Sequence, residues 1–163
     1  APPFERGEWA PAELFYMVRT LSELSQHPEA EQHKTPVIFD WTRRALNLSA
    51  TDHHANFVAT QLLRERALNL IAGYDFVILP ATPTTAFQAE LPGADPDRIF
   101  ESWANTFLFN LTEQPASSIP VGLDRSGLPI GVQIVGQRYV DVGVLGLSFA
   151  LEQAVGRLTA PLL

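Results

Sequence analysis

The sequence predicts an α/β fold, and three observations point to it. Apolar residues recur at helical spacing in several segments, which is typical of helices that pack one face against a core. Residues 76–79 form a short run with no polar face, which indicates a central strand covered on both sides. Residues 128–136 alternate small or polar residues with β-branched ones, as expected of a half-buried strand.

Three helices are expected before the first strand. Pro11 fits the first turn of a helix whose apolar stripe comprises Leu14, Val18, Leu21 and Leu24. Residues 37–46 predict a shorter helix after Pro36, with one apolar face made of Ile38, Trp41 and Ala45. Ser49 and Asp52 have the spacing of a capping box, and the helix they begin carries a stripe made of Ala55, Ala59, Leu62, Leu63, Ala67, Leu70 and Ile71. Gly73 is expected to end that helix.

The second half of the chain predicts a loop, a helix, a hairpin and a last helix. Residues 80–85 stop the apolar strand at its carboxyl end, where ligands usually meet an open α/β sheet, so this loop is a candidate pocket wall. Asp95 is expected to cap a helix that carries Ile99, Phe100, Trp103 and Phe107. Residues 124–127 are a turn sequence between two strands, and residues 141–157 predict the last helix.

Length and composition restrict the function classes. The 163 residues are enough to bury one core. A net charge of −7 without a basic stripe argues against nucleic acid as a direct partner. The absence of cysteine excludes thiolate metal sites and fits a reducing compartment, so a cytoplasmic location is expected. Neither a membrane span nor a signal peptide is indicated. The chain begins at Ala1 with residues typical of the middle of a polypeptide, so we expect a fragment.

A family resemblance rests on residues 109–136, which read FNLTEQPASSIPVGLDRSGLPIGVQIVG. This segment resembles the C-terminal third of the amidase signature family, in which N-L-T-G-x-P-A-x-S-x-P is followed by G-L-P-x-G-x-Q. Residues 74–83 are similar to the family's Y-D-x-x-x-x-P-x-x-P element. The resemblance covers residues 48–157, and residues 1–47 match only as a helical lead-in. Glu113 departs from the family, which usually has glycine at that position.

The resemblance implies a mixed β-sheet flanked by helices, with residues 1–163 as a single piece. It also implies hydrolysis of carboxylic amides through a serine acyl-enzyme, on a small or aryl amide substrate and without a metal or organic cofactor. The family's catalytic serines and lysine, and its glycine-rich oxyanion backbone, precede the matched region. We therefore expect no catalytic residue in this chain, which would supply sheet and pocket wall to an N-terminal portion that carries the nucleophile.

The serine pair Ser117 and Ser118 is the tempting alternative nucleophile. A nucleophilic serine needs a base within hydrogen-bond reach and oxyanion donors, yet its flanks are Ala116 and Ile119. The only lysine, Lys34, lies in a polar loop. We interpret the pair as strand residues that satisfy backbone groups.

Histidines and glycines suggest no cofactor or metal site. His53 and His54 follow Asp52, but adjacent helical side chains point about 100° apart, so an exposed first turn is the better interpretation. The glycines at 122, 131 and 136 are spread over the hairpin, which favours close packing of strand against helix over a phosphate cradle.

Five residues are candidates for the substrate pocket because they lie at strand ends or just beyond them: Thr82, Pro83, Phe87, Asn110 and Gln133. Asn110 also fits a buried amide that hydrogen-bonds the next turn. The alternative that all five are packing and turn residues stays open.

Two further function classes stay open. The chain could be a non-catalytic binding module that keeps part of the fold and covers its apolar faces by forming a homo-oligomer. It could also belong to the catalytic component of a transamidation complex acting on charged tRNA, which uses the same fold but is favoured by no residue pattern here.

Overall fold

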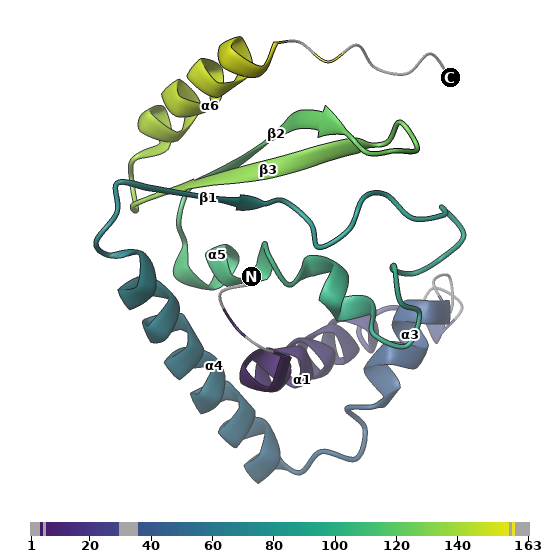
Figure 1. Ribbon diagram of the computed structural model, residues 1–163. Helices are drawn as coiled ribbons and strands as arrows, with labels where there is room; N and C mark the ends of the chain where they lie inside the picture. Colours follow the sequence, from purple (N-terminus) through teal and green to yellow (C-terminus); the bar gives the residue numbers. More distant parts are fainter. Residues whose placement is uncertain (1–3, 5, 30–35, 157, 159–163) are drawn as a thin grey trace. The chain divides into compact units, whose positions relative to one another are not determined.

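The computed structural model describes residues 4, 6–29, 36–156 and 158 of the chain (Figure 1). They form two compact units, Ala1–Glu65 and Arg66–Leu163. The first unit holds α1, α3 and most of α4, and the second holds the three strands with η1, α5 and α6. The boundary lies inside α4, downstream of residue 47, where the helical lead-in was expected to end.

Helix α1 spans Arg6–Leu24, so Pro11 lies inside it and the expectation that Pro11 opens the helix is wrong. Proline lacks an N–H, so near the N-terminal end it removes the single bond to the carbonyl of Gly7. The most buried side chains of α1 are Trp9, Ala12, Glu13 and Met17. The predicted stripe of leucines and Val18 is only half-buried, because the buried face lies to one side of it.

Helix α3 spans Pro36–Arg43 and ends before Leu46, which is exposed. Its buried Trp41 lies on the predicted apolar face. The indole Nε1 of Trp41 donates to Oε1 of Glu13 at 3.1 Å. This bond fastens α3 to α1, because it satisfies a carboxylate that is only 6% exposed.

Helix α4 spans Ala50–Ile71 and begins with the predicted capping box. The Asp52 N–H donates to Ser49 Oγ at 3.1 Å, and the Ser49 N–H donates to Asp52 Oδ2 at 3.1 Å. The Ser49 hydroxyl and N–H together hold the pKa of Asp52 below its usual range. The predicted stripe is partly wrong, because Leu62 and Leu70 are exposed and the buried face consists of Thr60, Leu63, Ala67 and Ile71.

The sheet contains β1 (Phe76–Pro80), β2 (Ala116–Leu123) and β3 (Pro129–Gly136). The strand order is β1-β3-β2, and both pairs are antiparallel. Among the described residues β1 therefore lies at an edge, and Ile78 on it is 50% exposed. The expectation of a central strand covered on both faces is wrong for this part of the chain, since an apolar run does not reveal how many strands pair beside it.

The predicted hairpin is confirmed. The Asp124 N–H donates to the Leu128 carbonyl at 2.8 Å across the turn, and Gly127 has a φ of +81°. A left-handed residue in this turn explains why glycine occupies the position. The pairing of β2 with β3 is irregular between Pro120 and Gly122, where proline cannot donate to the ladder.

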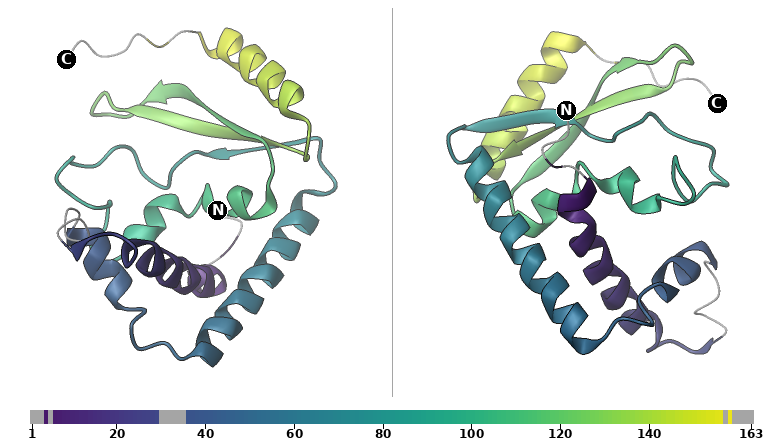
Figure 2. Two further views of the ribbon diagram at one scale, coloured as in Figure 1. Left: turned by 180° about the vertical axis from the view of Figure 1, so that it is seen from behind. Right: turned by 60° about the horizontal axis from the view of Figure 1, so that its bottom comes forward.

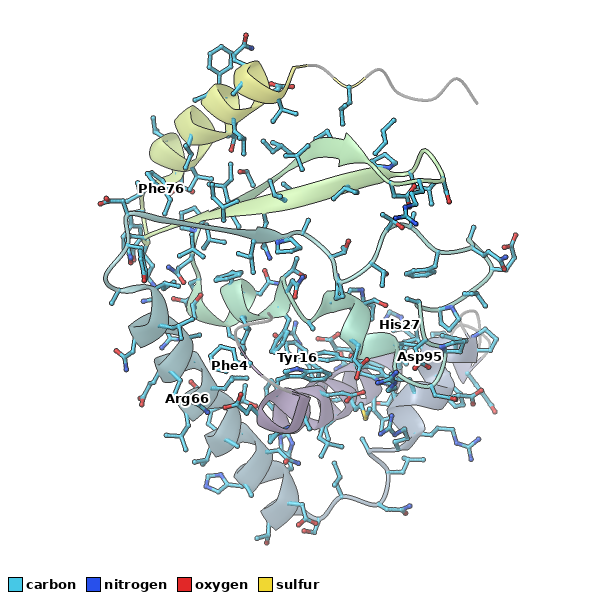
Figure 3. All side chains as sticks on the ribbon, viewed as in Figure 1. Phe4, Tyr16, His27, Arg66, Phe76 and Asp95 are labelled. Carbon is cyan, nitrogen blue, oxygen red and sulfur yellow. The ribbon has the colours of Figure 1, made fainter. Side chains whose placement is uncertain are left out.

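Two helices cover opposite faces of the sheet in the second unit, as Figures 1 and 2 show. Helix α6 (Asp141–Val155) lies over β2 and β3. Helix α5 (Phe107–Thr112) lies on the other face, where Phe109 packs with Val135 and Ile71. Figure 3 labels Phe76 at the start of β1, near the N-terminal end of α6. Alternate residues of β3 thus face two different layers, which confirms the α/β class.

The predicted helix after Asp95 is broken into two. A 3₁₀ helix, η1, spans Ile99–Trp103, and α5 begins only at Phe107. The ring of Phe100 joins both pieces, with centroids 5.9 Å from Trp103 and 5.1 Å from Phe107. The last helix ends at Val155, and Arg157 lies outside the described residues. None of the described helices is long and apolar enough to span a membrane.

Candidate functional site

The carboxyl end of β1 is held by a chain of buried amides. The Asn105 Nδ2 donates to the main-chain carbonyl of Pro80 at 3.0 Å, and the Gln133 Nε2 donates to the main-chain carbonyl of Asn105 at 2.5 Å. Asn105 and Gln133 are 7% and 3% exposed. Because buried amides are costly to leave unpaired, these bonds fix where the chain leaves the sheet.

Three of the five pocket candidates lie in the segment that leaves β1 at this point. Thr82, Pro83 and Phe87 are all exposed. The Thr82 hydroxyl donates to the Thr84 carbonyl at 2.6 Å, which closes a small turn. The structure therefore brings these three residues into one exposed loop next to the end of β1.

The other two candidates lie in different environments. Gln133 lies opposite Leu79 in the sheet, close to the base of the loop, but its amide is directed to Asn105. Asn110 lies on α5 and is exposed, so the expectation of a buried amide is wrong. Within the described residues no hydrogen bond joins Asn110 to the other four candidates.

Asn105 is the polar residue that sequence reasoning missed. It occupies the role expected of Asn110, because it is the buried amide that bridges two segments. The sequence predicted one continuous helix through residue 105. An asparagine inside a predicted helix gives no indication that its amide will be buried and will bridge two segments. The break between η1 and α5 is the feature that directs Asn105 toward β1, since asparagine favours such turns.

The N-L-T-E-Q-P run forms a turn that joins the end of α5 to the end of β3. The Gln114 Nε2 donates to the Gly136 carbonyl at 3.0 Å, and the Arg138 Nε donates to the Thr112 carbonyl at 2.8 Å. Glu113 between them has a φ of 57° and a ψ of 35°, so it keeps the left-handed conformation that glycine favours. Its Oε2 lies 2.9 Å from Nη2 of Arg138. Glu113 therefore takes a conformation that a glycine at this position would also permit, and its side chain adds an ion pair to the turn.

The serine pair lies in β2, as predicted. The Ser117 Oγ lies 2.5 Å from Oγ of Ser148 on α6, and the Ser148 hydroxyl donates to the Val144 carbonyl at 2.7 Å. Ser148 has a single hydroxyl proton, so Ser117 is the donor in the pair. The Ser117 proton is thus directed to another hydroxyl and not to a base. Ser118 is exposed.

Asp124 connects the hairpin turn to the loop after β1. Its Oδ1 accepts from the N–H groups of Ser126 at 2.8 Å and Leu128 at 2.9 Å. Its Oδ2 accepts from the Thr85 hydroxyl at 2.9 Å. The Leu128 N–H and the Thr85 hydroxyl hold the pKa of Asp124 below its usual range. The carboxylate is therefore anchored as an anion at ordinary pH.

The histidine cluster gives no metal site in the part of the chain that the structure describes, where no group of three or more potential ligands is found. His53 stacks on Phe15, with ring centroids 5.8 Å apart and an interplanar angle of 7°. Its neighbour His54 is exposed. Lys34 lies outside the described residues, so the structure does not place the only lysine.

Known proteins with similar sequences include components of a transamidation enzyme. A glutamyl-tRNA(Gln) amidotransferase subunit from Ruegeria pomeroyi is 40% identical over 91 residues, which cover 55% of this chain and 18% of that protein. The corresponding protein of Roseobacter denitrificans is 34% identical over 110 residues, covering 67% of this chain and 22% of that protein. The chain thus spans about a fifth of the length of these relatives.

Solved structures share the fold. A bacterial aryl acylamidase of the amidase signature family superposes with a TM-score of 0.73 at 19% identity, over 98% of this chain and 38% of that one. The glutamyl-tRNA(Gln) amidotransferase subunit from Thermotoga maritima superposes with a TM-score of 0.61 at 24% identity, over 88% and 32%. The family model described as Amidase matches residues 9–145, which extends upstream of the predicted limit at residue 48. This chain belongs to the amidase family.

Proposed function

We propose that this chain is the C-terminal portion of an amide hydrolase that works through a serine acyl-enzyme. In this proposal it supplies the sheet and one wall of the substrate pocket, and the nucleophile stands in an N-terminal portion of the enzyme. The substrate is a small or aryl carboxamide, and no cofactor takes part. Two findings support this division. The family model matches residues 9–145, and the chain aligns with only 38% of the aryl acylamidase.

The observation that carries the proposal is the hydrogen bonding of Ser117. Its proton points to Ser148, whose own proton points to a main-chain carbonyl, so the chain of donors ends without a base. A serine becomes nucleophilic when a base within hydrogen-bond reach takes its proton. Ser117 therefore fits a role in packing α6 on β2, and the chemistry is assigned to residues outside this chain.

The pocket wall is assigned to the exposed loop of Thr82, Pro83 and Phe87. The loop begins at the end of β1, which the buried amides of Asn105 and Gln133 hold in place, so the start of the loop has a fixed position. Gln133 supports the base of this wall from inside. Asn110 lies on α5, and its amide is exposed. In this proposal the amide meets a substrate or another part of the enzyme.

A second candidate is a component of a transamidase. The relatives that are 34–40% identical are glutamyl-tRNA(Gln) amidotransferase subunits, which is the observation in its favour. The net charge of −7 makes this portion a poor surface for direct contact with tRNA. In this alternative the chain would still form the amide-binding side, and partner subunits would hold the tRNA.

The test is a chimera in which this chain replaces the matching part of the bacterial aryl acylamidase. We expect the chimera to hydrolyse 4-nitroacetanilide, and the 163-residue chain alone to be inactive. A fluorophosphonate, which labels nucleophilic serines, should modify only a serine from the acylamidase part. Ser117→Ala and Ser118→Ala chimeras should keep the kcat of the parent chimera.

Three kinds of result would contradict the proposal. Labelling of Ser117 or Ser118, or a loss of kcat in either alanine variant with an unchanged circular dichroism spectrum, would place the nucleophile in this chain. A folded chimera that is inactive would favour the non-catalytic binding module. Glutamine-dependent activity without hydrolysis of the aryl amide would favour the transamidase.

A further inference from the structure

The loop after β1 is fastened at two points to the hairpin. The first point is its base, where the Ala81 N–H donates to the Gly131 carbonyl at 2.9 Å. The second is the bond from the Thr85 hydroxyl to Asp124, which joins residues 39 positions apart. Only residues 82–84 lie between the two fastenings, and all three are exposed. The short loop is therefore closed against the sheet at both ends.

The two oxygens of Asp124 perform different tasks. Oδ1 accepts from Ser126 and Leu128 and shapes the hairpin turn, whereas Oδ2 is left for Thr85. A carboxylate held by main-chain donors has one orientation, so it presents Oδ2 at a defined place. The hairpin turn thus serves as a fixed support for a loop from a different part of the sheet.

We propose that Asp124 is a positioning residue, which clasps Thr85 and thereby fixes the loop of residues 82–84 as the wall of the substrate site. The consequence for the substrate rests on the proposed function, but the clasp itself does not. Thr82 and Pro83 on this loop are two of the residues assigned to the wall. Ordering a residue costs conformational entropy, so a wall ordered in advance binds its substrate more tightly.

Amide hydrogen exchange of the 163-residue chain tests the clasp. Thr85→Val removes the hydroxyl and keeps the branched shape, so exchange at Ala81, whose N–H donates to the Gly131 carbonyl at the base of the loop, should accelerate about three- to tenfold. Asp124→Asn should accelerate it as well. Thr85→Ser retains a hydroxyl and should restore slow exchange. Thr84→Val is the matched control, because the carbonyl of Thr84 and not its hydroxyl takes part in the turn.

Residues 141–155 of α6 serve as an internal reference for folding in each variant. Unchanged exchange at Ala81 in Thr85→Val, with exchange in α6 unaffected, would overturn the clasp. If α6 loses protection in Asp124→Asn, the comparison of Thr85→Val with Thr84→Val decides alone.

Kinetics of the acylamidase chimera test the link to the substrate. Thr85→Val should raise KM about three- to tenfold with little change in kcat, and Thr85→Ser, which retains the hydroxyl, should restore the KM of the parent chimera. Faster exchange with an unchanged KM would overturn the positioning role while leaving amide hydrolysis intact. A parent chimera that is inactive would contradict the proposed function, and the exchange experiment would still decide whether the clasp exists.

Discussion

The substitution Gly136→Ala tests how closely β3 and α6 pack. A Cβ added at Gly136 would lie 2.7 Å from Cγ2 of Val144 and 3.5 Å from Cε1 of Phe76. Val144 is 3% exposed, so its side chain has no free space to move into. We expect the added methyl group to push α6 away from the end of β3.

The magnitude follows from two opposing terms. An extra methyl in a well-packed core costs about 1–3 kcal/mol, and replacing glycine restricts the unfolded chain and returns about 0.4–1 kcal/mol. The free energy of unfolding should therefore fall by roughly 0.5–2 kcal/mol. Urea unfolding of the 163-residue chain, followed by circular dichroism, measures it. Gly122→Ala is the control, because nothing lies within 4 Å of its added Cβ, and it should be neutral or stabilising.

A double-mutant cycle with Val144→Ala isolates the contact. Truncating Val144 alone should cost about 1–3 kcal/mol for the lost burial and the cavity. The double variant should be no less stable than Val144→Ala, because the new methyl occupies the vacated space, which is a coupling of about 1 kcal/mol. Strict additivity, or a Gly136→Ala variant as stable as the parent chain, would refute the packing argument.

Three further outcomes are expected. Ser49→Ala should lower the Tm by about 2–4 °C in a thermal melt, because the Asp52 N–H loses its acceptor, and an unchanged Tm would contradict the capping box. Glu113→Gly should unfold at a free energy about 1 kcal/mol higher than Glu113→Ala, since both lose the ion pair and only glycine is unstrained at positive φ; equal stabilities would argue against strain. The lowered pKa values of Asp52 and Asp124 should stabilise the fold above the unfolded-state pKa of about 3.9, and this contribution should be lost as pH falls through the lower folded-state values. An acid titration of the Asp52→Asn and Asp124→Asn variants should show a shallower loss of stability than the parent chain, and parallel curves would contradict it.

Features that depend on neighbouring residues were readable in the sequence. The capping box of Ser49 and Asp52 and the hairpin turn of residues 124–127 both formed as predicted. Each is decided by contacts within a few residues, so no distant part of the chain can change it. The resemblance of residues 109–136 to the motif of the amidase signature family likewise predicted the family.

Features that depend on distant contacts were not readable. Helix α4 has apolar residues on more than one face, so periodicity could not choose between Leu62, which is exposed, and Thr60, which is buried. The helix is broken around Asn105, whose amide donates to the Pro80 carbonyl 25 residues away, and no local pattern reveals that partner.

The candidate site divides in the same way. The sequence by itself determined that the loop after residues 76–80 leaves a strand end, since proline and threonine follow an apolar run, and it predicted that this loop forms a pocket wall. Only the tertiary structure decided that Asn105 and Asp124 support this loop and that β1 lies at an edge of the described sheet. Hydrogen bonds that join residues separated by 25 or 39 positions leave no periodic pattern in the sequence. They are specified by the packing around the sheet and not by the spacing of residues along the chain.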